Sequence, residues 1–167
     1  GLRGISHVLS TGCTSSTDAI GYAAALIRQG DADVLLTGGA DACVTPGMIF
    51  GFCRMRVTST KYNDRPAEAS RPFDRGRDGF VLGEGAWLMT LEREERARER
   101  GAKIYATIDG YGSTCDAYHR VQMDPDGTEI VRAIELALRR SGRAVEEIGY
   151  VNYHGTSTTL NDAVESR

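Results

Sequence analysis

The amino-acid sequence predicts an α/β protein in which helices cover a β-sheet. Segments with strand patterns and segments with helix patterns alternate along the 167 residues. The apolar run at 33–37 is unbroken, which is typical of a strand in a sheet that is covered on both faces. The segment 15–29 has few polar sides, which predicts a buried helix.

A strand, a turn and a helix are the first predicted elements. His7 to Ser10 is a short apolar-rich run expected to form a buried strand, and Thr11-Gly12 supplies a tight turn. The helix extends from about Ser15 to Gln29, because Gly30 can adopt the left-handed conformation that ends a helix. With the strand from Asp33 to Thr37, these segments form a predicted β-α-β unit.

Gly38 to about Arg77 is predicted to be irregular, because it contains prolines and several glycines. The remaining expected elements are a strand within 79–92, a charged helix over 93–100, a strand at 104–109, a helix from about 128 to about 142, a strand at 150–153 and a helix from about 161. A weak domain boundary falls near Gly101-Ala102-Lys103.

Composition excludes several classes of function. The 23 acidic and 20 basic residues give a formal charge of -3 and are spread along the chain, so we expect no nucleic-acid partner and no membrane surface. No apolar run approaches the roughly 20 residues of a membrane span, and the start resembles no signal peptide, so the expected compartment is the cytoplasm. The four cysteines form no close CxxC pair, which argues against a disulfide framework or a metal site. No cofactor is expected.

Because the sequence lacks an initiator Met and stops where a helix is starting, we expect an internal piece of a longer protein.

Cys13 lies where the first predicted strand turns sharply into a helix, the position at which a nucleophile elbow presents its side chain. A helix N-terminus stabilises a thiolate by about 0.3 to 1 kcal/mol, and the backbone N–H groups of the turn could bind an oxyanion. The alternative is a small core cysteine, as expected for the other three cysteines.

His154 follows a predicted strand and precedes Gly-Thr-Ser-Thr, so its imidazole is expected at a carboxyl end of the sheet, where α/β proteins collect functional groups. The alternative is an ordinary loop histidine. That alternative is stronger for His119, and His7 is expected to be a packing residue. Spacing alone therefore supports a possible cysteine enzyme using Cys13 and His154.

The motifs around these two residues resemble those of the β-ketoacyl synthases. Ser10-Thr11-Gly12-Cys13-Thr14-Ser15-Ser16 resembles their active-site cysteine motif, and His154-Gly155-Thr156-Ser157-Thr158 resembles their first histidine motif. Segments 30–40, 70–74 and 77–85 also look like this family. The resemblance implies a thiolase-like layered αβαβα fold, incomplete here, with 1–101 ending the N-terminal half and 102–167 starting the C-terminal half.

By this resemblance, Cys13 takes an acyl group from an acyl carrier protein, and His154 stabilises the enolate formed when malonyl carrier protein loses carbon dioxide. Thr156 and Thr158 would contact the phosphopantetheine arm, although a role as loop and helix-cap residues is equally open. Glu165 matches a structural acid. The family's second histidine and its lysine would lie beyond residue 167, and His119 does not replace them.

The chain looks closest to the discrete type II enzymes of fatty acid or polyketide pathways. Their chain-length-factor partners lack the nucleophile, so Cys13 indicates the catalytic subunit of a homodimer or of a heterodimer with such a partner. Two alternatives stay open: a thiolase-type or cysteine acyl-hydrolase relative, and a non-catalytic partner subunit. We expect residues 1–167 alone to be inactive and to aggregate or unfold in part, because sheet edges would lie open.

Overall fold

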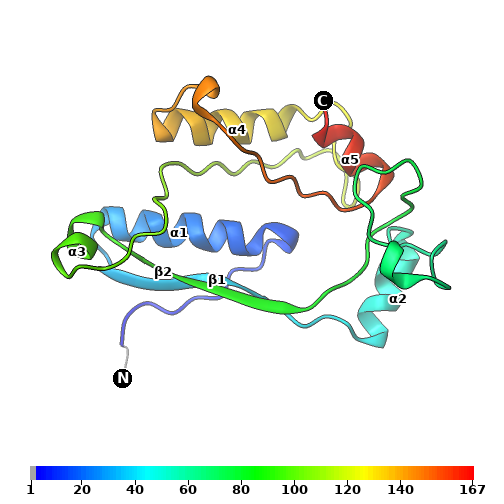
Figure 1. The fold of residues 1–167 in the computed structure, drawn as a ribbon, viewed down its shortest axis with the longest axis horizontal. Coiled ribbons are helices and arrows are strands. Elements are labelled where there is room, and N and C mark those ends of the chain that lie inside the picture. Colours follow the sequence, from blue (N-terminus) through cyan, green and yellow to red (C-terminus); the bar gives the residue numbers. More distant parts are fainter. Residues whose placement is uncertain (1–2) are drawn as a thin grey trace.

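The computed structural model describes residues 3–167 (Figure 1). Its helices and strands are α1 (Ser15–Gln29), β1 (Val34–Asp41), α2 (Pro46–Met55), β2 (Gly85–Glu92), α3 (Glu94–Glu99), α4 (Thr128–Ser141) and α5 (Thr159–Glu165). In Figure 1, α1 lies between the two-stranded sheet and α4. None of the helices in this described part combines the length and the apolar character that a membrane span requires.

Helix α1 begins and ends where the sequence predicts. Its Ala23, Ala24 and Ile27 are buried, which explains the shortage of polar residues along it. Gly30 ends the helix in the left-handed conformation, with φ at 88°, and donates its N–H back to the carbonyl of Ile27. The helix packs on β1 so closely that a Cβ atom at Gly39 would lie 2.6 Å from Cβ of Ser16.

Strands β1 and β2 pair antiparallel along their whole length, from Val34 opposite Glu92 to Asp41 opposite Gly85. Both strands were predicted, although β1 continues beyond Thr37 and β2 begins only at Gly85. Helix α1 covers one face of the pair. On the other face Leu36 and Leu88 are 64% and 61% exposed, so within residues 3–167 the predicted cover on both faces is absent.

Three predicted strands do not form. Residues 7–10, 104–109 and 150–153 are extended but pair with no other segment in the described part of the chain, so the first unit is turn-helix-strand and not β-α-β. An apolar run indicates burial, whereas a strand also needs a neighbour for its N–H and C=O groups. The stretch that contains 104–109 packs instead against α4: a Cβ atom at Gly110 would lie 2.1 Å from the carbonyl oxygen of Ala137.

Helix α2 lies inside the stretch predicted to be irregular, so that prediction was wrong for 46–55. Its start carries a recognisable signal. The Thr45 hydroxyl accepts the N–H of Met48 at 3.4 Å, and Pro46 occupies the first turn, where a missing N–H costs nothing. The helix ends at Arg56 in the left-handed conformation, without a glycine to mark its end.

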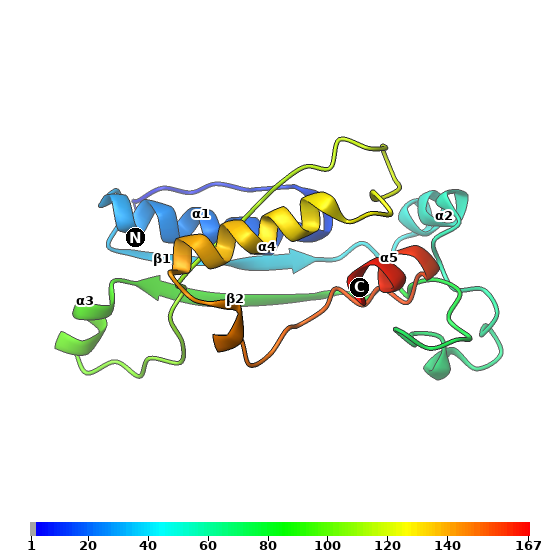
Figure 2. The ribbon, with the colours of Figure 1, turned by 90° about the horizontal axis from the view of Figure 1, so that it is seen from above.

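The later helices form close to their predicted positions. Helix α3 falls within 93–100, and α4 begins at Thr128 and ends before Gly142, which is left-handed with φ at 68°. Helix α5 begins at Thr159, two residues before the predicted start. These segments were predictable because apolar spacing and terminal glycines are local signals. Figure 2 shows α5, which directly follows the histidine motif in the chain, next to the segment that follows α2.

Candidate active site

Cys13 lies in a single 3₁₀ turn, Gly12–Thr14, that leads directly into α1. Gly12 has φ at 75°, a conformation that favours glycine, so the turn can reverse sharply before the helix. Ser15 holds the turn together, because its hydroxyl donates to the Gly12 carbonyl at 2.6 Å and accepts the Thr11 N–H at 2.9 Å. The thiol is exposed at this position.

Asp18, one helical turn further along, also anchors this turn. Its Oδ2 accepts the hydroxyl of Thr11 at 2.5 Å and that of Thr14 at 3.2 Å, the residues on either side of Gly12 and Cys13. The Thr11 hydroxyl, followed by that of Tyr111, lowers the pKa of Asp18, so the carboxylate is charged near neutral pH. Spacing alone did not predict a role for Asp18.

The His154 loop is held by Glu165 at the end of α5. The Glu165 carboxylate accepts the backbone N–H of His154 at 2.6 Å and that of Gly155 at 2.8 Å. The side-chain amide of Asn161 donates to the same carboxylate at 2.8 Å. Because these are charge-assisted hydrogen bonds to backbone groups, they fix the backbone from which the imidazole projects.

The structure brings Cys13 and His154 together. A hydrogen bond with the His154 side chain lowers the pKa of the Cys13 thiol and outweighs both desolvation and the charge of Asp41, which raise it. The same hydrogen bond raises the pKa of His154, with Glu165 acting in the same direction and desolvation against it. Both shifts act in the direction of a thiolate beside an imidazolium.

A buried polar cluster connects the His154 loop to the segment 71–79. Asp162 and Ser157 are only 1% and 0% exposed. The Asp162 carboxylate accepts the N–H of Phe73 at 2.8 Å and that of Ser157 at 3.2 Å, and it forms an ion pair with Arg77 at 3.3 Å. Arg77 also donates to the carbonyl oxygen of Thr158 at 3.2 Å. Arg77 begins the segment 77–85, whose resemblance to the family was the available signal for this role.

An aromatic contact lies beside the loop. The ring of Phe73 meets that of Tyr153 edge to face, with centroids 5.4 Å apart. Phe73 has φ at 63°, an unfavourable conformation for a bulky residue, and its hydrogen bond to Asp162 holds it there. A Cβ atom at Gly155 would make only an ordinary contact with the Phe73 ring, at 3.4 Å, so glycine is favoured there by its φ of 54°.

The remaining candidate residues have separate environments. Thr156 and Thr158 are half-buried, and their hydroxyls hydrogen-bond to each other at 2.8 Å. Nδ1 of His119 accepts the N–H groups of Val121 and Gln122, both at 3.1 Å, which gives His119 a local role in its loop. His7 is exposed and stacks on Tyr22, with ring centroids 5.6 Å apart.

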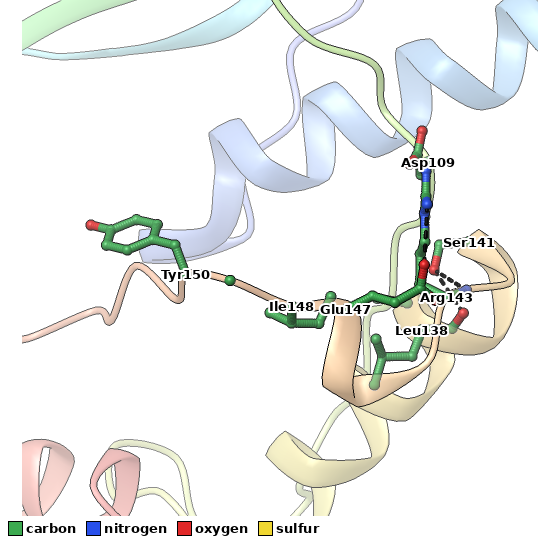
Figure 3. Close-up of a pocket in the computed structure, with 10 residues that line it drawn as sticks. Asp109, Leu138, Ser141, Arg143, Glu147, Ile148 and Tyr150 are labelled. Carbon is green, nitrogen blue, oxygen red and sulfur yellow. Dashed lines mark hydrogen bonds and ion pairs between the residues drawn. The ribbon is translucent and has the colours of Figure 1, made fainter.

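A separate pocket of about 450 Å³ lies between α4 and the extended segments around it (Figure 3). Its polar side chains pair with one another, because Arg143 lies 3.2 Å from Asp109 and 3.4 Å from Glu147. Neither Cys13 nor His154 lines it. Across residues 3–167 no group of three or more His, Cys, Asp or Glu side chains is arranged to hold a metal ion.

Comparison with known protein families defines the class that this fold and site represent. Residues 1–97 match the β-ketoacyl synthase N-terminal domain, and residues 105–167 match the β-ketoacyl synthase C-terminal domain. The chain therefore belongs to the β-ketoacyl synthase family, as its motifs indicated, and the predicted α/β, thiolase-like fold class is confirmed by its similarity to solved ketosynthases.

Individual relatives show how much of such a protein this chain represents. It is 49% identical over 165 residues to 3-oxoacyl-[acyl-carrier-protein] synthase 2 of Vibrio cholerae, covering 99% of this chain and 40% of that protein. It is 46% identical over 166 residues to the tetracenomycin polyketide synthase ketoacyl synthase alpha subunit of Streptomyces glaucescens, covering 99% of this chain and 39% of the relative.

A solved structure of a type II polyketide synthase acyl-carrier protein in complex with its ketosynthase, bound to the hexaketide, superimposes with a TM-score of 0.92 at 39% identity. The match covers 95% of this chain and 39% of that one. The chain thus spans about two fifths of the length of the relatives it matches.

Proposed function

We propose that the whole protein is a β-ketoacyl synthase, an acyltransferase that condenses malonyl-acyl carrier protein with an acyl group held on Cys13. The observation that carries this proposal is the pairing of Cys13, at the start of α1, with His154 on a loop fixed by Glu165. A thiolate beside an imidazolium is an activated nucleophile with a proton donor next to it. The names of the relatives point to the same reaction.

The first step is acyl transfer. The Cys13 thiolate attacks the thioester carbonyl of the acyl carrier protein, and backbone N–H groups of the turn, including that of Cys13, stabilise the oxyanion. The carbon–sulfur bond to the phosphopantetheine arm then breaks. The departing sulfur takes a proton from the His154 imidazolium, so the arm leaves as a thiol. Acylation also removes the thiolate that was the main cause of the raised pKa of His154.

The second step needs neutral His154, which the first step has produced. Malonyl carrier protein enters, its carboxylate leaves as carbon dioxide, and the electron pair of the broken bond forms an enolate. The imidazole N–H of His154 donates to the enolate oxygen. The enolate carbon attacks the acyl carbonyl, the new carbon–carbon bond forms, and the Cys13 thiolate is released. Thr156 and Thr158 are proposed to hydrogen-bond the arm, and their mutual bond of 2.8 Å would open for it.

The rest of the assignment follows from this function. Residues 1–101 are proposed as the end of the N-terminal half and 102–167 as the start of the C-terminal half, supported by family matches that end at 97 and begin at 105. The proposed partners are an acyl carrier protein and a second ketosynthase-type subunit, either identical or a chain-length factor. The complex of the similar ketosynthase with its carrier protein supports the first of these. A cytoplasmic location remains part of the proposal.

Mass spectrometry of the full-length protein tests the function. We expect stoichiometric modification of Cys13 by an acyl carrier protein thioester, and by the condensing-enzyme inhibitor cerulenin, that is lost in Cys13→Ala and retained in the control Cys53→Ala. Malonyl carrier protein should then convert the acyl group to a β-ketoacyl product. Release of free acid without the malonyl extender would indicate a hydrolase. A folded protein with unlabelled Cys13 would favour a non-catalytic partner subunit.

A further inference from the structure

Tyr111 connects the segment after α3 to α1, the helix that follows the turn with the proposed nucleophile. Its hydroxyl donates a hydrogen bond to Oδ1 of Asp18. Its ring lies flat against α1 at Gly21, where an added Cβ atom would come within 2.5 Å of ring carbon Cγ. The Tyr111 ring therefore occupies a space on α1 that exists only because residue 21 has no side chain; we call this space the Gly21 notch. Both contacts fix Tyr111 on the first two turns of α1.

The same carboxylate holds the turn that contains Cys13. While Oδ1 of Asp18 accepts from Tyr111, Oδ2 accepts from the hydroxyls of Thr11 and Thr14. Thr14 is the immediate neighbour of Cys13 in the chain. A hydrogen bond that orients one side of the carboxylate thus restricts the other side, and with it the backbone on either side of the thiol.

Tyr111 is itself held from the opposite direction by α4. Its carbonyl oxygen accepts from Nη1 of Arg140 at 2.8 Å. The neighbouring Gly112 lies so close to α4 that an added Cβ atom would be 2.0 Å from the carbonyl oxygen of Ala133. A continuous set of contacts therefore leads from α4 through Tyr111 and Asp18 to the Cys13 turn.

We propose that Tyr111 and Asp18 are positioning residues for Cys13, which hold its turn so that the thiol faces His154. The inference rests on the proposed function for the role of Cys13 as nucleophile. Tyr111 belongs to the segment matched by the C-terminal domain and Asp18 to the segment matched by the N-terminal domain. The contact makes the geometry of the nucleophile depend on how the two segments are docked.

The test uses the full-length protein and the variants Tyr111→Phe and Asp18→Asn. The phenylalanine keeps the ring in the Gly21 notch and removes only the hydroxyl. Tyr105→Phe is the matched control, because Tyr105 is 86% exposed with its ring under Lys103. The rate of Cys13 alkylation by iodoacetamide is followed by mass spectrometry from about pH 6 to about pH 9.5, with Cys53 in the same molecule as an internal reference.

We expect Tyr111→Phe and Asp18→Asn to raise the apparent pKa of Cys13 by about half a unit to one unit, because a loosened turn weakens its contact with His154. Alkylation near pH 7 should fall about three- to ten-fold, while Cys53 and Tyr105→Phe stay unchanged. The other charged groups that act on Cys13 are His154 and Asp41, and both remain in every variant. An unchanged Cys13 profile in a folded Tyr111→Phe protein would overturn the inference.

Failure of this inference is distinguishable from failure of the proposed function. Alkylation by iodoacetamide needs neither carrier protein nor malonyl group. If wild-type Cys13 is acylated and condenses but Tyr111→Phe leaves its alkylation unchanged, the positioning role is wrong and the synthase assignment stands. If Tyr111→Phe slows alkylation but no carrier thioester acylates the wild type, the positioning role stands and the assignment is wrong.

Discussion

The guanidinium Nε of Arg77 lies 3.3 Å from Oδ2 of Asp162, and the Asp162 side chain is fully buried while that of Arg77 is 17% exposed. Arg77 also donates to the carbonyl oxygens of Thr158 and Thr159, at 3.2 Å and 3.1 Å. One side chain thus neutralises the buried carboxylate under the His154 loop and binds the backbone at the start of α5. The position of the His154 loop therefore depends on Arg77, which lies about 80 positions earlier in the chain.

Removing Arg77 should destabilise the protein and displace the loop. For Arg77→Gln we expect a loss of about 3 kcal/mol in the free energy of unfolding, because the buried carboxylate of Asp162 loses its counter-charge. Urea unfolding of the full-length protein measures this. Arg75→Gln, an exposed change two residues away, is the control and should stay within about 0.5 kcal/mol. Equal stabilities for the two variants would contradict the proposed role of the ion pair.

Replacing Glu165 should change the backbone position and the pKa of His154, although the imidazole itself is not substituted. Glu165→Gln keeps the shape of the side chain but removes the charge that attracts the N–H groups of His154 and Gly155. We expect the free energy of unfolding to fall by about 1 to 3 kcal/mol. It also removes one cause of the raised pKa of His154.

We expect condensation by Glu165→Gln to fall more than acylation of Cys13, because the enolate relies directly on the position of His154. Separate assays of acylation and of product formation check this. Glu146→Gln, at an exposed site in the first turn of the 3₁₀ segment Val145–Glu147, is the control. A uniform loss in both steps would instead indicate general destabilisation.

The pH dependence of Cys13 reactivity should show whether the thiol is paired with His154. The pKa of the thiol is lowered, so the thiolate forms at lower pH than in an ordinary cysteine, and reactivity rises with pH through that lowered value. His154→Ala removes the largest lowering influence and leaves desolvation and Asp41, both of which raise the pKa.

The alkylation profile of His154→Ala should therefore move to higher pH, with lower reactivity near pH 7. His119→Ala provides the comparison, since His119 only accepts hydrogen bonds within its own loop. A His154→Ala profile that coincides with the wild type would show that the two side chains do not interact in solution.

Gly79 should tolerate no side chain. Its φ is 154°, and an added Cβ atom would lie 2.3 Å from the carbonyl carbon of Thr58. Its N–H donates to the carbonyl oxygen of buried Ser157 at 3.0 Å, so a shift of this backbone would be transmitted to the histidine motif. We expect Gly79→Ala to lower the free energy of unfolding by about 3 kcal/mol or more, because backbone strain and overpacking act together.

Gly83 is a matched control for that change, because an added Cβ atom meets nothing within 4 Å there and its φ carries no such restriction. Gly83→Ala should stay within about 0.5 kcal/mol of the wild type in thermal or urea unfolding. Similar losses for the two alanine variants would mean that the close approach of Gly79 to Thr58 is not retained in solution.

Local chemistry was sufficient to predict much of this molecule. The bounds of α1 follow from its apolar composition and from Gly30, and those of α4 from apolar spacing that stops before Gly142. The Cys13 and His154 motifs indicated the family and pointed to the two side chains that we propose as the reactive pair. The start of α2 was also readable, since Thr45 and Pro46 are a helix-start signal that the prolines and glycines around them obscured.

Tertiary structure alone decided which segments pair and which distant residues meet. Strand β1 pairs with β2 across α2 and a long loop, whereas 104–109 and 150–153 have equally suitable sequences and pair with nothing within residues 3–167. The contacts of Arg77 with Asp162 and of Tyr111 with Asp18 join segments far apart in the chain. Periodicity and capping act over a few residues, but such contacts depend on where the whole backbone places two side chains, which no local pattern encodes.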